Sequence, residues 1–355
     1  MENSLSSAFE NALDVGCMTG VLAVVVQERF GKMARLLHLE IEYLHERIIR
    51  YVTQIGKPES EAAEEWRIIG KVFDTPDQMQ RSFDSMQHLW ANGFSRGASD
   101  RISIVEPYRA WPDLRLILME EAPGTRLRHM IKDVQATPEH LRLLAAAAVK
   151  LHRCPLSIGS PLRVEQLLSS CHPRPQRLAK NFPELAAAIN HIVAAARQIE
   201  NGFAGDICTL IHGDFHLAHA LMENENCRII DLDDMSCGDP AIDLAEVFVF
   251  LKRTARKKKM ADYIDGLRDE FVSSYAAAMG WEIIGREPLY ESLLNLKRAC
   301  KCFRVQDESG WQEKMVQLVE QAAACMQVMD LDRLDPGKFD FDKVIERYER
   351  CPGTV

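Results

Sequence analysis

The sequence lacks the excess of positive charge that a general nucleic-acid binder needs. Its 355 residues hold 43 Lys and Arg against 52 Asp and Glu, a formal net charge of -9, whereas nucleic-acid-binding surfaces are basic. It also lacks a long apolar run in its early part, because Val21–Val26 is far too short to cross a bilayer. No basic stretch precedes an apolar one at the N-terminus, which excludes an ordinary export signal. We expect a soluble, cytoplasmic protein that binds neither nucleic acid nor membrane.

Cysteine is present, but not in a pattern that builds a fold or a metal site. The 10 cysteines are too sparse for a disulfide scaffold, and none stands in a Cys-x-x-Cys pair, which argues against a zinc ribbon. Cys208 and Cys227 fall on segments that we expect to be buried strands, so we expect reduced thiols in a reducing cytosol. The chain shows no internal repeat, and its length suits two domains or one large bilobal domain.

Two short apolar segments each end in a charged cluster. Residues 207–211 lead into His-Gly-Asp214, and residues 227–230 lead into Asp231. Apolar residues that end abruptly in carboxylates indicate buried strands whose ends open into a site, so we expect Asp214 and Asp231 to face one another. Two such carboxylates repel unless they share a proton, meet a cation or hold a metal. This arrangement suits phosphoryl transfer.

These motifs resemble the aminoglycoside phosphotransferase and choline kinase-like family. The matching motifs, in order and spacing, are His212-Gly213-Asp214, Ile230-Asp231, Gly238-Asp239-Pro240 and Asp243-Leu244-Ala245. The resemblance implies an α+β, bilobal protein kinase-like fold, with a small antiparallel β lobe carrying one helix and a larger, mostly helical lobe. The implied boundaries are a nucleotide-binding lobe at residues 1–118, a hinge at 119–124, and a helical lobe with the catalytic loop and substrate site at 125–355.

The resemblance also implies an activity and the residues that perform it. The γ-phosphate of ATP or GTP would pass to a hydroxyl of a small molecule, with Asp214 as acceptor of the hydroxyl proton. Asp231 would hold Mg²⁺ through a hard carboxylate oxygen, and Asp233 is a candidate second ligand. Lys71 would hold the nucleotide phosphates.

The first lobe contains three expected strands followed by a helix. Residues 36–44 and 47–55 alternate apolar and polar side chains, as an antiparallel pair does, and residues 66–73 carry Lys71 in an apolar setting. A buried ammonium needs a partner; the alternative is a lysine on the solvent face of an edge strand. Asp84, the central acid of the helix that Thr75-Pro76 opens, is either that partner or a solvated acid. We also expect strands at 102–107 and 114–119, and helices with one strand near Val21–Val26 within residues 1–33.

Two further segments of this lobe are candidates for nucleotide contacts. The turn Leu44-His-Glu-Arg47 has no glycine to present backbone donors to phosphates, and Arg47 could replace them. The resemblance places adenine contacts on backbone groups of Glu120, Glu121 and Ala122, at a hinge that Pro-Gly124 ends. The alternative for this hinge is a simple turn.

His219 departs from the family motif, which has Asn five residues after the aspartate. Imidazole nitrogen is a poor ligand for Mg²⁺, and Mn²⁺ or Zn²⁺ tolerates it better. Three alternatives follow. A second metal is dispensable, and His219 bonds a phosphate oxygen or Asp214; the metal preference shifts toward Mn²⁺; or the site is inactive and the protein is a kinase-like nucleotide-binding or interaction protein.

A second class of enzyme has to be weighed against the kinase. A transition-metal hydrolase could use the ligands His212, Asp214, His216, His219 and Asp231. Strand alternation argues against it, because these side chains cannot all point the same way, and the Gly-Asp-Pro motif would have no purpose.

The helical lobe carries the expected acceptor site. Acidic side chains there could recruit a cationic acceptor such as an amino sugar or an aminoalcohol. The one basic run, residues 252–259, is more typical of a solvated helix end than of an anion or membrane contact. The expected helices span residues 137–152, 183–203, 261–279, 288–303 and 311–329, with short helices within 164–181, a helix after Asp239-Pro240 and a short helix near 339–348.

Overall fold

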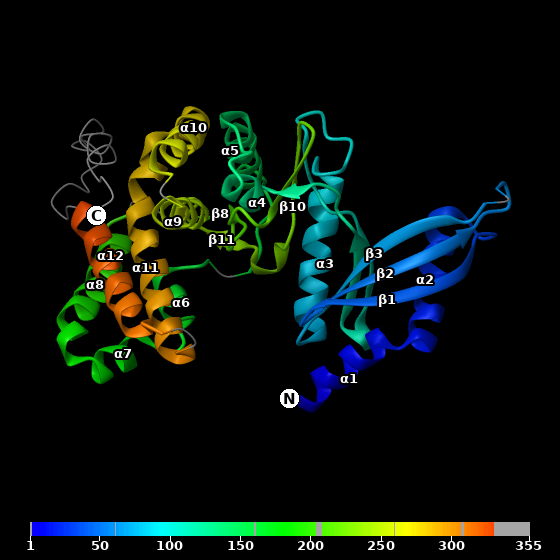
Figure 1. Cartoon of the computed structure of the whole chain (residues 1–355), viewed down its shortest axis with the longest axis horizontal. Coiled ribbons are helices and arrows are strands. Elements are labelled where there is room, and N and C mark those ends of the chain that lie inside the picture. The colour runs from blue at the N-terminus through cyan, green and yellow to red at the C-terminus, as the bar shows by residue number, and fades with distance from the viewer. Residues whose placement is uncertain are drawn as a thin grey trace. The chain divides into compact units, whose positions relative to one another are not determined.

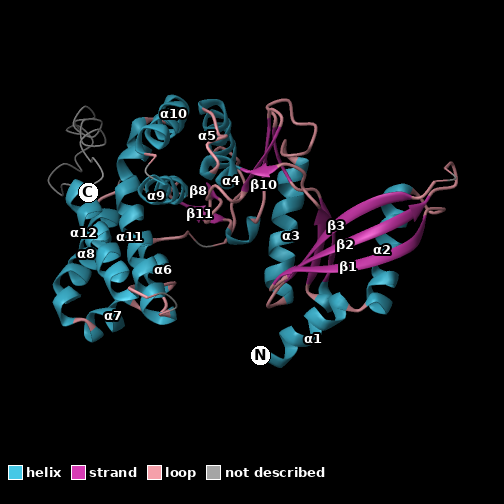
Figure 2. Cartoon of the chain, in the orientation of Figure 1, coloured by secondary structure: helices cyan, strands magenta, loops and turns pink. Residues whose placement is uncertain are grey.

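The chain divides into two compact units. The computed structural model describes residues 2–60, 62–159, 161–203, 208–258, 260–306 and 309–329. The first unit comprises Met1–Thr125 and Leu221–Asp233, and the second comprises Arg126–Ala220 and Asp234–Val355. Strands dominate the first unit and helices the second (Figure 2). Residues 221–233 group with the first unit, which the expected boundaries did not anticipate.

A five-stranded antiparallel sheet forms most of the first unit (Figure 1). Its order is β1 (Arg35–His45), β2 (Ile48–Gly56), β3 (Glu64–Val72), β6 (Leu116–Glu120) and β5 (Pro107–Trp111). Burial alternates along β2, with every second side chain buried, which is the pattern of a strand with one face on a core. The expected pair at 36–44 and 47–55 is therefore confirmed.

The N-terminal segment is helical throughout its described length, as α1 (Glu2–Leu13) and α2 (Val15–Phe30). The strand that we expected near Val21–Val26 is wrong. Met18, Val21, Leu22 and Val25 are buried at helical spacing and pack against the sheet. A short apolar run does not by itself distinguish a strand from a buried helix, and the Asp14 side chain, which accepts from the Cys17 amide at 2.6 Å, caps the helix.

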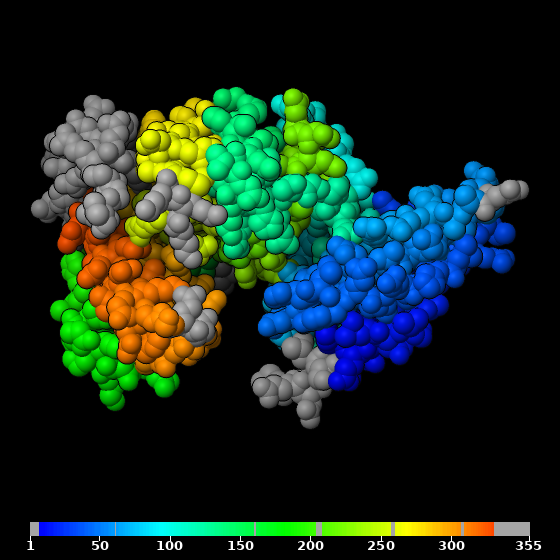
Figure 3. Space-filling view, in the orientation of Figure 1, coloured from blue at the N-terminus to red at the C-terminus, as the bar shows by residue number. Residues whose placement is uncertain are grey.

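A second, smaller sheet explains why residues 221–233 belong with the first unit. Its order is β4 (Ile102–Ile104), β10 (Asn226–Ile229), β9 (Ala220–Glu223) and β7 (Thr125–Arg126). β10 pairs with β4 in parallel, and in Figure 3 the yellow-green atoms of this segment stand against cyan atoms of the first unit. The strand expected at 102–107 is thus divided between β4 and β5. Between β3 and β4 lies α3 (Pro76–Ala91), where Thr75 Oγ1 accepts from the Gln78 amide at 3.2 Å.

The second unit is mostly helical. Its helices are α4 (Leu127–Lys132), α5 (Pro138–His152), α6 (Val164–Ser169), α7 (Pro175–Asn181), α8 (Pro183–Asn201), α9 (Ala241–Lys258), α10 (Ala261–Met279), α11 (Trp281–Val305) and α12 (Trp311–Val328). Of these, α6, α7, α8, α9, α11 and α12 share one apolar core. The expected helix at 288–303 begins earlier, at Trp281, directly after Gly280 with φ 93°. The helix expected near 339–348 lies outside the described residues.

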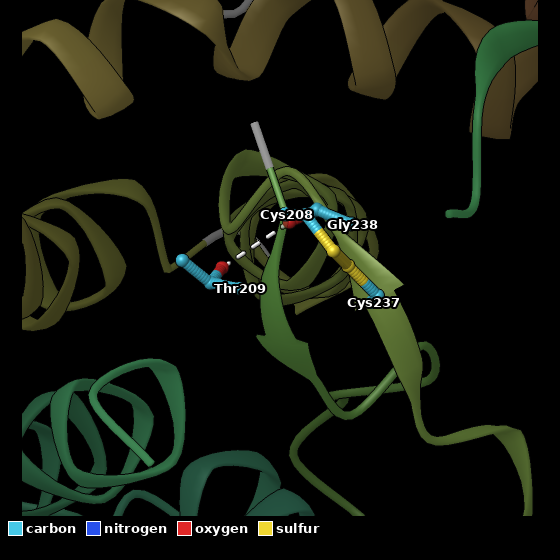
Figure 4. Close-up of a disulfide and its surroundings, with 4 residues drawn as sticks. All are labelled: Cys208, Thr209, Cys237 and Gly238. Carbon is cyan, nitrogen blue, oxygen red and sulfur yellow. Dashed lines mark hydrogen bonds between the residues drawn. A yellow bond between two sulfur atoms is a disulfide. The ribbon is translucent and has the colours of Figure 1, made fainter. Parts of the chain in front are cut away.

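Two cysteines that we expected to be reduced are joined in the structure. β8 (Thr209–Ile211) pairs antiparallel with β11 (Ser236–Gly238), and this pairing brings the Cα atoms of Cys208 and Cys237 to 5.1 Å, where they form a disulfide (Figure 4). Such a separation is normal for a disulfide. The pair is 29 residues apart in sequence, so no local pattern announces it. Cys227 remains a free, fully buried thiol, and burial raises its pKa to about 12.

The length and apolar composition of the helices decide whether one of them could span a membrane. Within the described part of the chain, no single helix has both the length and the apolar composition to span a membrane. Only the bent pair Ser7–Leu13 and Val15–Phe30, with 72° between its helices, meets that test when both are taken together.

Candidate functional site

Lys71 has two carboxylate partners within the first unit. It lies on β3, where it is paired with Ile117 of β6, and its side chain is 15% exposed. Nζ lies 2.5 Å from Oδ1 of Asp231 and 2.5 Å from Oδ2 of Asp233. Burial alone would lower the pKa of this ammonium, but the charges of Asp233 and Asp231 outweigh burial and raise it. A buried lysine on a central strand therefore finds the partner that its burial requires.

The two aspartates reach Lys71 from the segment that follows β10. Asp231 has φ 64°, in the left-handed region that residues other than glycine rarely adopt. Such backbone outliers concentrate at functional sites. Asp233 also accepts a hydrogen bond from Ser82 Oγ of α3 at 3.2 Å. Hard carboxylate oxygens from both residues fit a Mg²⁺ ion.

Asp84, the expected acid on α3, does not serve Lys71. Its side chain is exposed and accepts from Gln80 Nε2 at 2.7 Å, so it is the solvated acid that was the alternative. Sequence reasoning selected it by charge and overlooked Ser82, a neutral residue on the buried side of the same helix. The signal for Ser82 in the sequence was its spacing, three residues after Met79 and four before Met86, both buried on the same helix.

The other nucleotide-contact candidates are occupied by contacts within the first unit. Arg47 lies in the turn between β1 and β2, and Nη1 bonds Asp74 Oδ2 at 2.8 Å. Glu120 ends β6 with its side chain buried, where Oε2 accepts from the Glu106 amide and Oε1 pairs with Arg96. These contacts give both side chains structural partners, and the roles expected for Arg47 and for the backbone of 120–122 stay predictions.

Glu121 and Ala122 complete the expected hinge. Glu121 Oε1 accepts from Arg50 Nε at 2.8 Å, which ties the chain after β6 to β2. Ala122 follows without regular structure. Gly124 has φ 111°, and a Cβ there would lie 2.8 Å from the Met222 carbonyl oxygen. Glycine is required at this position by both conformation and space.

Asp214 stands on a loop that Asp243 holds from below, within the second unit. The carboxylate of Asp243 is fully buried on α9 and accepts from the amides of His212 at 2.8 Å and Gly213 at 2.9 Å. It also bonds His152 Nε2 at 3.0 Å, and His152 Nδ1 lies 2.8 Å from the Tyr275 hydroxyl. Asp243 therefore has a structural role: it holds the backbone of the loop that carries Asp214.

Gly213 lets the loop approach its neighbour closely. Its φ is 80°, and a Cβ would collide with the backbone carbonyl oxygen of Asp234. Any other residue would push the two loops apart and move Asp214. Asp239 holds the second loop in place: it accepts from the Ala241 amide at 3.0 Å and from Arg286 Nε at 2.7 Å. Sequence reasoning missed Arg286, which carries no motif.

Two histidines surround the Asp214 carboxylate. His219 Nδ1 lies 2.9 Å from the Asp214 carbonyl oxygen and 3.7 Å from Oδ2, so Nδ1 carries the proton and donates it. His216 Nδ1 accepts from the Ala218 amide at 3.2 Å, which leaves the proton on Nε2, 3.9 Å from Asp214 Oδ2. The rings stack with centroids 3.8 Å apart. Burial and the neighbouring His219 lower the pKa of His216.

This geometry matches one of the alternatives for His219 and fits a metal centre poorly. His219 bonds Asp214, through the main-chain oxygen. Asp214, His216 and His219 each offer an atom within 4.8 Å of the others, but a histidine that ligates a metal usually donates its other N–H, whereas His216 Nδ1 accepts. His212 of the proposed hydrolase set is fully buried. The expected meeting of Asp214 with Asp231 stays a prediction.

The sequence is similar to a known protein family. The model of the phosphotransferase enzyme family matches residues 62–283, which is more than half of the chain. No protein of curated function matches the sequence significantly.

Three solved structures share the fold at low sequence identity. A choline/ethanolamine kinase family protein from Mesorhizobium loti has a TM-score of 0.56 at 12% identity, covering 89% of this chain and 97% of that one. The amicoumacin kinase hAmiN, in complex with AMP-PNP, has a TM-score of 0.59 at 14% identity, covering 87% and 94%. A thermostable mutant of the aminoglycoside phosphotransferase APH(4)-Ia, in a complex with ADP and hygromycin B, has a TM-score of 0.55 at 12% identity, covering 86% and 98%. The expected α+β, kinase-like fold is confirmed.

Proposed function

Because the chain belongs to the phosphotransferase enzyme family, we propose that it transfers the γ-phosphate of ATP or GTP to a hydroxyl of a small molecule. The observation that carries this proposal is Lys71 on β3, bonded to Asp231 and Asp233. A lysine held by carboxylates on a central strand is the arrangement that kinase-like sites use to hold nucleotide phosphates and their metal. The structures of hAmiN and APH(4)-Ia hold AMP-PNP and ADP, respectively, which supports a nucleotide as donor.

Asp214 is the proposed acceptor of the hydroxyl proton. Its loop is held by the two hydrogen bonds that Asp243 accepts, and its carboxylate is 36% exposed. As the acceptor oxygen bonds to phosphorus, its proton passes to Asp214 and the nucleoside diphosphate leaves. A positioned carboxylate of this kind contributes about 100- to 10,000-fold to the rate.

Asp231 and Asp233 are the proposed metal residues. Their oxygens suit Mg²⁺, which when bound neutralises charge on the phosphates. Lys71 holds both carboxylates in one place. A metal ion would therefore find its carboxylate ligands, and the phosphates their ammonium partner, already in position. His219, whose Nδ1 is bonded to the Asp214 carbonyl, serves the Asp214 loop and is not needed as a metal ligand. Mn²⁺ remains a second candidate ion for the test below.

A screen of small alcohols for nucleotide consumption tests the proposal. Purified full-length protein is incubated with ATP or GTP, with Mg²⁺ or Mn²⁺, and each alcohol, and diphosphate release is measured. We expect one acceptor class to raise consumption well above the rate with water. In parallel, nucleotide with metal should raise the melting temperature. If no combination of nucleotide and metal stabilises the protein, the assignment as a kinase fails. That result would favour the alternative that the protein is an inactive, kinase-like interaction protein.

A further inference from the structure

Three helices of the second unit carry arginines that form no ion pair with a carboxylate of the described residues. Arg128 lies at the start of α4, Arg253 near the end of α9 and Arg298 on α11. The guanidinium carbons of Arg128 and Arg253 lie 5.9 and 5.6 Å from the centroid of the same ring, Phe250. The positive charge of Arg253 also lowers the pKa of Arg298. We call Arg128, Arg253 and Arg298 the cationic cluster.

The carboxylates that act on the cationic cluster are Glu246, on Arg253 and Arg298, and Glu291, on Arg298, and among the described residues neither forms an ion pair with these arginines. Among the side chains that the structure describes, Arg128 and Arg253 form no ion pair, and Nε of Arg128 is buried without a hydrogen-bond partner. Arg298 bonds only the neutral Asn295 Oδ1, at 3.2 Å. Burial and then Arg128 lower the pKa of Arg253, and burial and then Arg253 lower that of Arg298. An excess of positive charge therefore stands in a partly buried place, which is unfavourable unless an anion arrives.

Other cations on the same helices form ion pairs with buried carboxylates. Lys252, one residue before Arg253, bonds Glu291 Oε2 at 2.5 Å. Arg286 of α11 makes two bonds to Asp239, at 2.7 and 3.1 Å. Both are satisfied by a buried carboxylate. Among the described residues, Glu246 makes no such bond to Arg253 or Arg298, and one carboxyl does not balance the charge of three guanidinium groups.

Two links connect the cationic cluster to Asp214. The backbone amide of Arg128 donates to the Leu217 carbonyl oxygen at 2.9 Å, in the loop that begins with Asp214. Glu246 lies one turn before Phe250 on α9, and the charge of Asp214 raises the pKa of its carboxyl while the charges of Lys297 and Arg298 lower it. All of these residues belong to the second unit. The cationic cluster is thus joined, through the backbone of Arg128, to the loop that carries Asp214.

We propose that the cationic cluster binds an anionic group of the phosphate acceptor, a carboxylate or a phosphate, while its hydroxyl faces Asp214. This inference rests on the proposed function and names its substrate class: an acidic alcohol, and not the cationic amino sugar or aminoalcohol expected from the acidic side chains of this lobe. Guanidinium groups bind carboxylate and phosphate through paired N–H donors, and three of them on different helices can surround one anion.

Binding of simple anions tests the cluster directly, without turnover. Inorganic phosphate, acetate and choline are titrated calorimetrically into the full-length protein and into Arg253→Gln and Arg298→Gln. We expect phosphate or acetate to bind the wild-type protein. Each variant should bind the same anion with an affinity about 10-fold or more lower. Choline should not bind. Arg197→Gln is the matched control, since this exposed arginine of α8 pairs with Glu165 and should bind anions as the wild type does. Arg253→Lys keeps the charge but loses the paired N–H donors, so it should bind anions with an affinity between those of the wild type and Arg253→Gln, and it replaces Arg253→Gln in the test if that variant folds poorly.

The same variants separate this inference from the proposed function. ATP affinity should be unchanged in Arg253→Gln; if ATP binding weakens instead of anion binding, the cluster serves the nucleotide and the inference is overturned. Equal anion binding by wild type and variants, or none by the wild type, also overturns it. Anion binding without any nucleotide binding would defeat the proposed function alone. With ATP present, glycerate and glycerol 3-phosphate, which distinguish the two anion sources, should be better acceptors than glycerol or the cationic 2-amino-1,3-propanediol, and the reverse order contradicts the inference.

Discussion

The Lys71 ammonium lies 2.5 Å from Oδ1 of Asp231, although the two residues are 160 positions apart in the chain. The contact exists because β10 returns to the first unit and pairs with β4. The residues proposed for phosphates and metal therefore belong to one compact unit. Asp214 and the cationic cluster belong to the other. Nucleotide binding and acceptor binding should accordingly respond to different substitutions.

Replacing Lys71 by Met should weaken nucleotide binding. The change removes the cation that holds Asp231 and Asp233, and a lost charge-assisted contact of about 1.5 to 3 kcal/mol corresponds to roughly 10- to 100-fold in affinity. Calorimetric titration of ATP with Mg²⁺ measures the effect. Arg67→Met is the control, because Arg67 lies on the same strand but pairs with Glu65 in solvent. Equal affinities for all three proteins would remove Lys71 from the site.

Asp214→Asn should abolish turnover and leave nucleotide binding nearly intact. Asparagine keeps the shape of the side chain but cannot accept the hydroxyl proton, so kcat should fall about 100- to 10,000-fold. Steady-state kinetics and ATP titration give the two numbers. Asp84→Asn, which changes an exposed acid bonded to Gln80, is the control. A variant that keeps wild-type turnover would show that proton transfer occurs elsewhere.

His219→Asn tests the departure from the family motif. Histidine Nδ1 donates to the Asp214 carbonyl, and asparagine would offer a carbonyl oxygen to Mg²⁺ instead. If the native site is weakened by this residue, the variant should show higher activity with Mg²⁺ and a lower ratio of Mn²⁺ to Mg²⁺ activity. Activity is measured across a titration of each metal. A fall with both metals would mean that the bond to Asp214 is the contribution of His219.

The sequence predicted those features that depend on residues close together in the chain. Alternation gave β1 and β2, and the apolar setting of Lys71 correctly demanded a partner. Pairings between distant segments were out of reach: Ser82 reaches Asp233 and Cys208 reaches Cys237 only after the chain has folded. The prediction of a strand at Val21–Val26 was wrong for a different reason: a six-residue apolar run is compatible with both a strand and a buried helix. The cationic cluster was invisible because its members come from three helices, and the basic run at 252–259 concealed that Lys252 is paired while Arg253 is not.

Asp243→Asn should destabilise the protein and slow catalysis together. One amide group cannot replace both oxygens that accept from His212 and Gly213, so a buried N–H loses its partner. Such losses cost about 1 to 3 kcal/mol each, and the loop that carries Asp214 would shift. Denaturant unfolding and kcat are the measurements. Asp269→Asn, on an exposed residue of α10, should change neither. Loss of stability with normal kcat would limit Asp243 to folding.

Glu246 gives the protein a stability that depends on pH. Burial first, and then the charge of Asp214, raise its pKa from 4.5 to about 7. Because the folded pKa lies above the unfolded one for an acid, ionisation opposes folding: stability falls as pH rises from about 4.5 and levels off above about 7. The other charges that act on this carboxyl are Asp243, Lys297 and Arg298.

Glu246→Gln should therefore melt at a higher temperature than the wild type at pH 8, and the difference should shrink toward pH 5. Both proteins contain the same histidines, so the difference between their melting curves isolates Glu246. The affinity of the wild type for acetate, which stays ionised throughout, should also fall between pH 6 and pH 8, because the ionised Glu246 carboxylate competes for Lys297 and Arg298. The acetate affinity of the variant should stay flat over this range. A melting difference that does not change with pH would show that Glu246 is already ionised at pH 5 and plays no part in either effect.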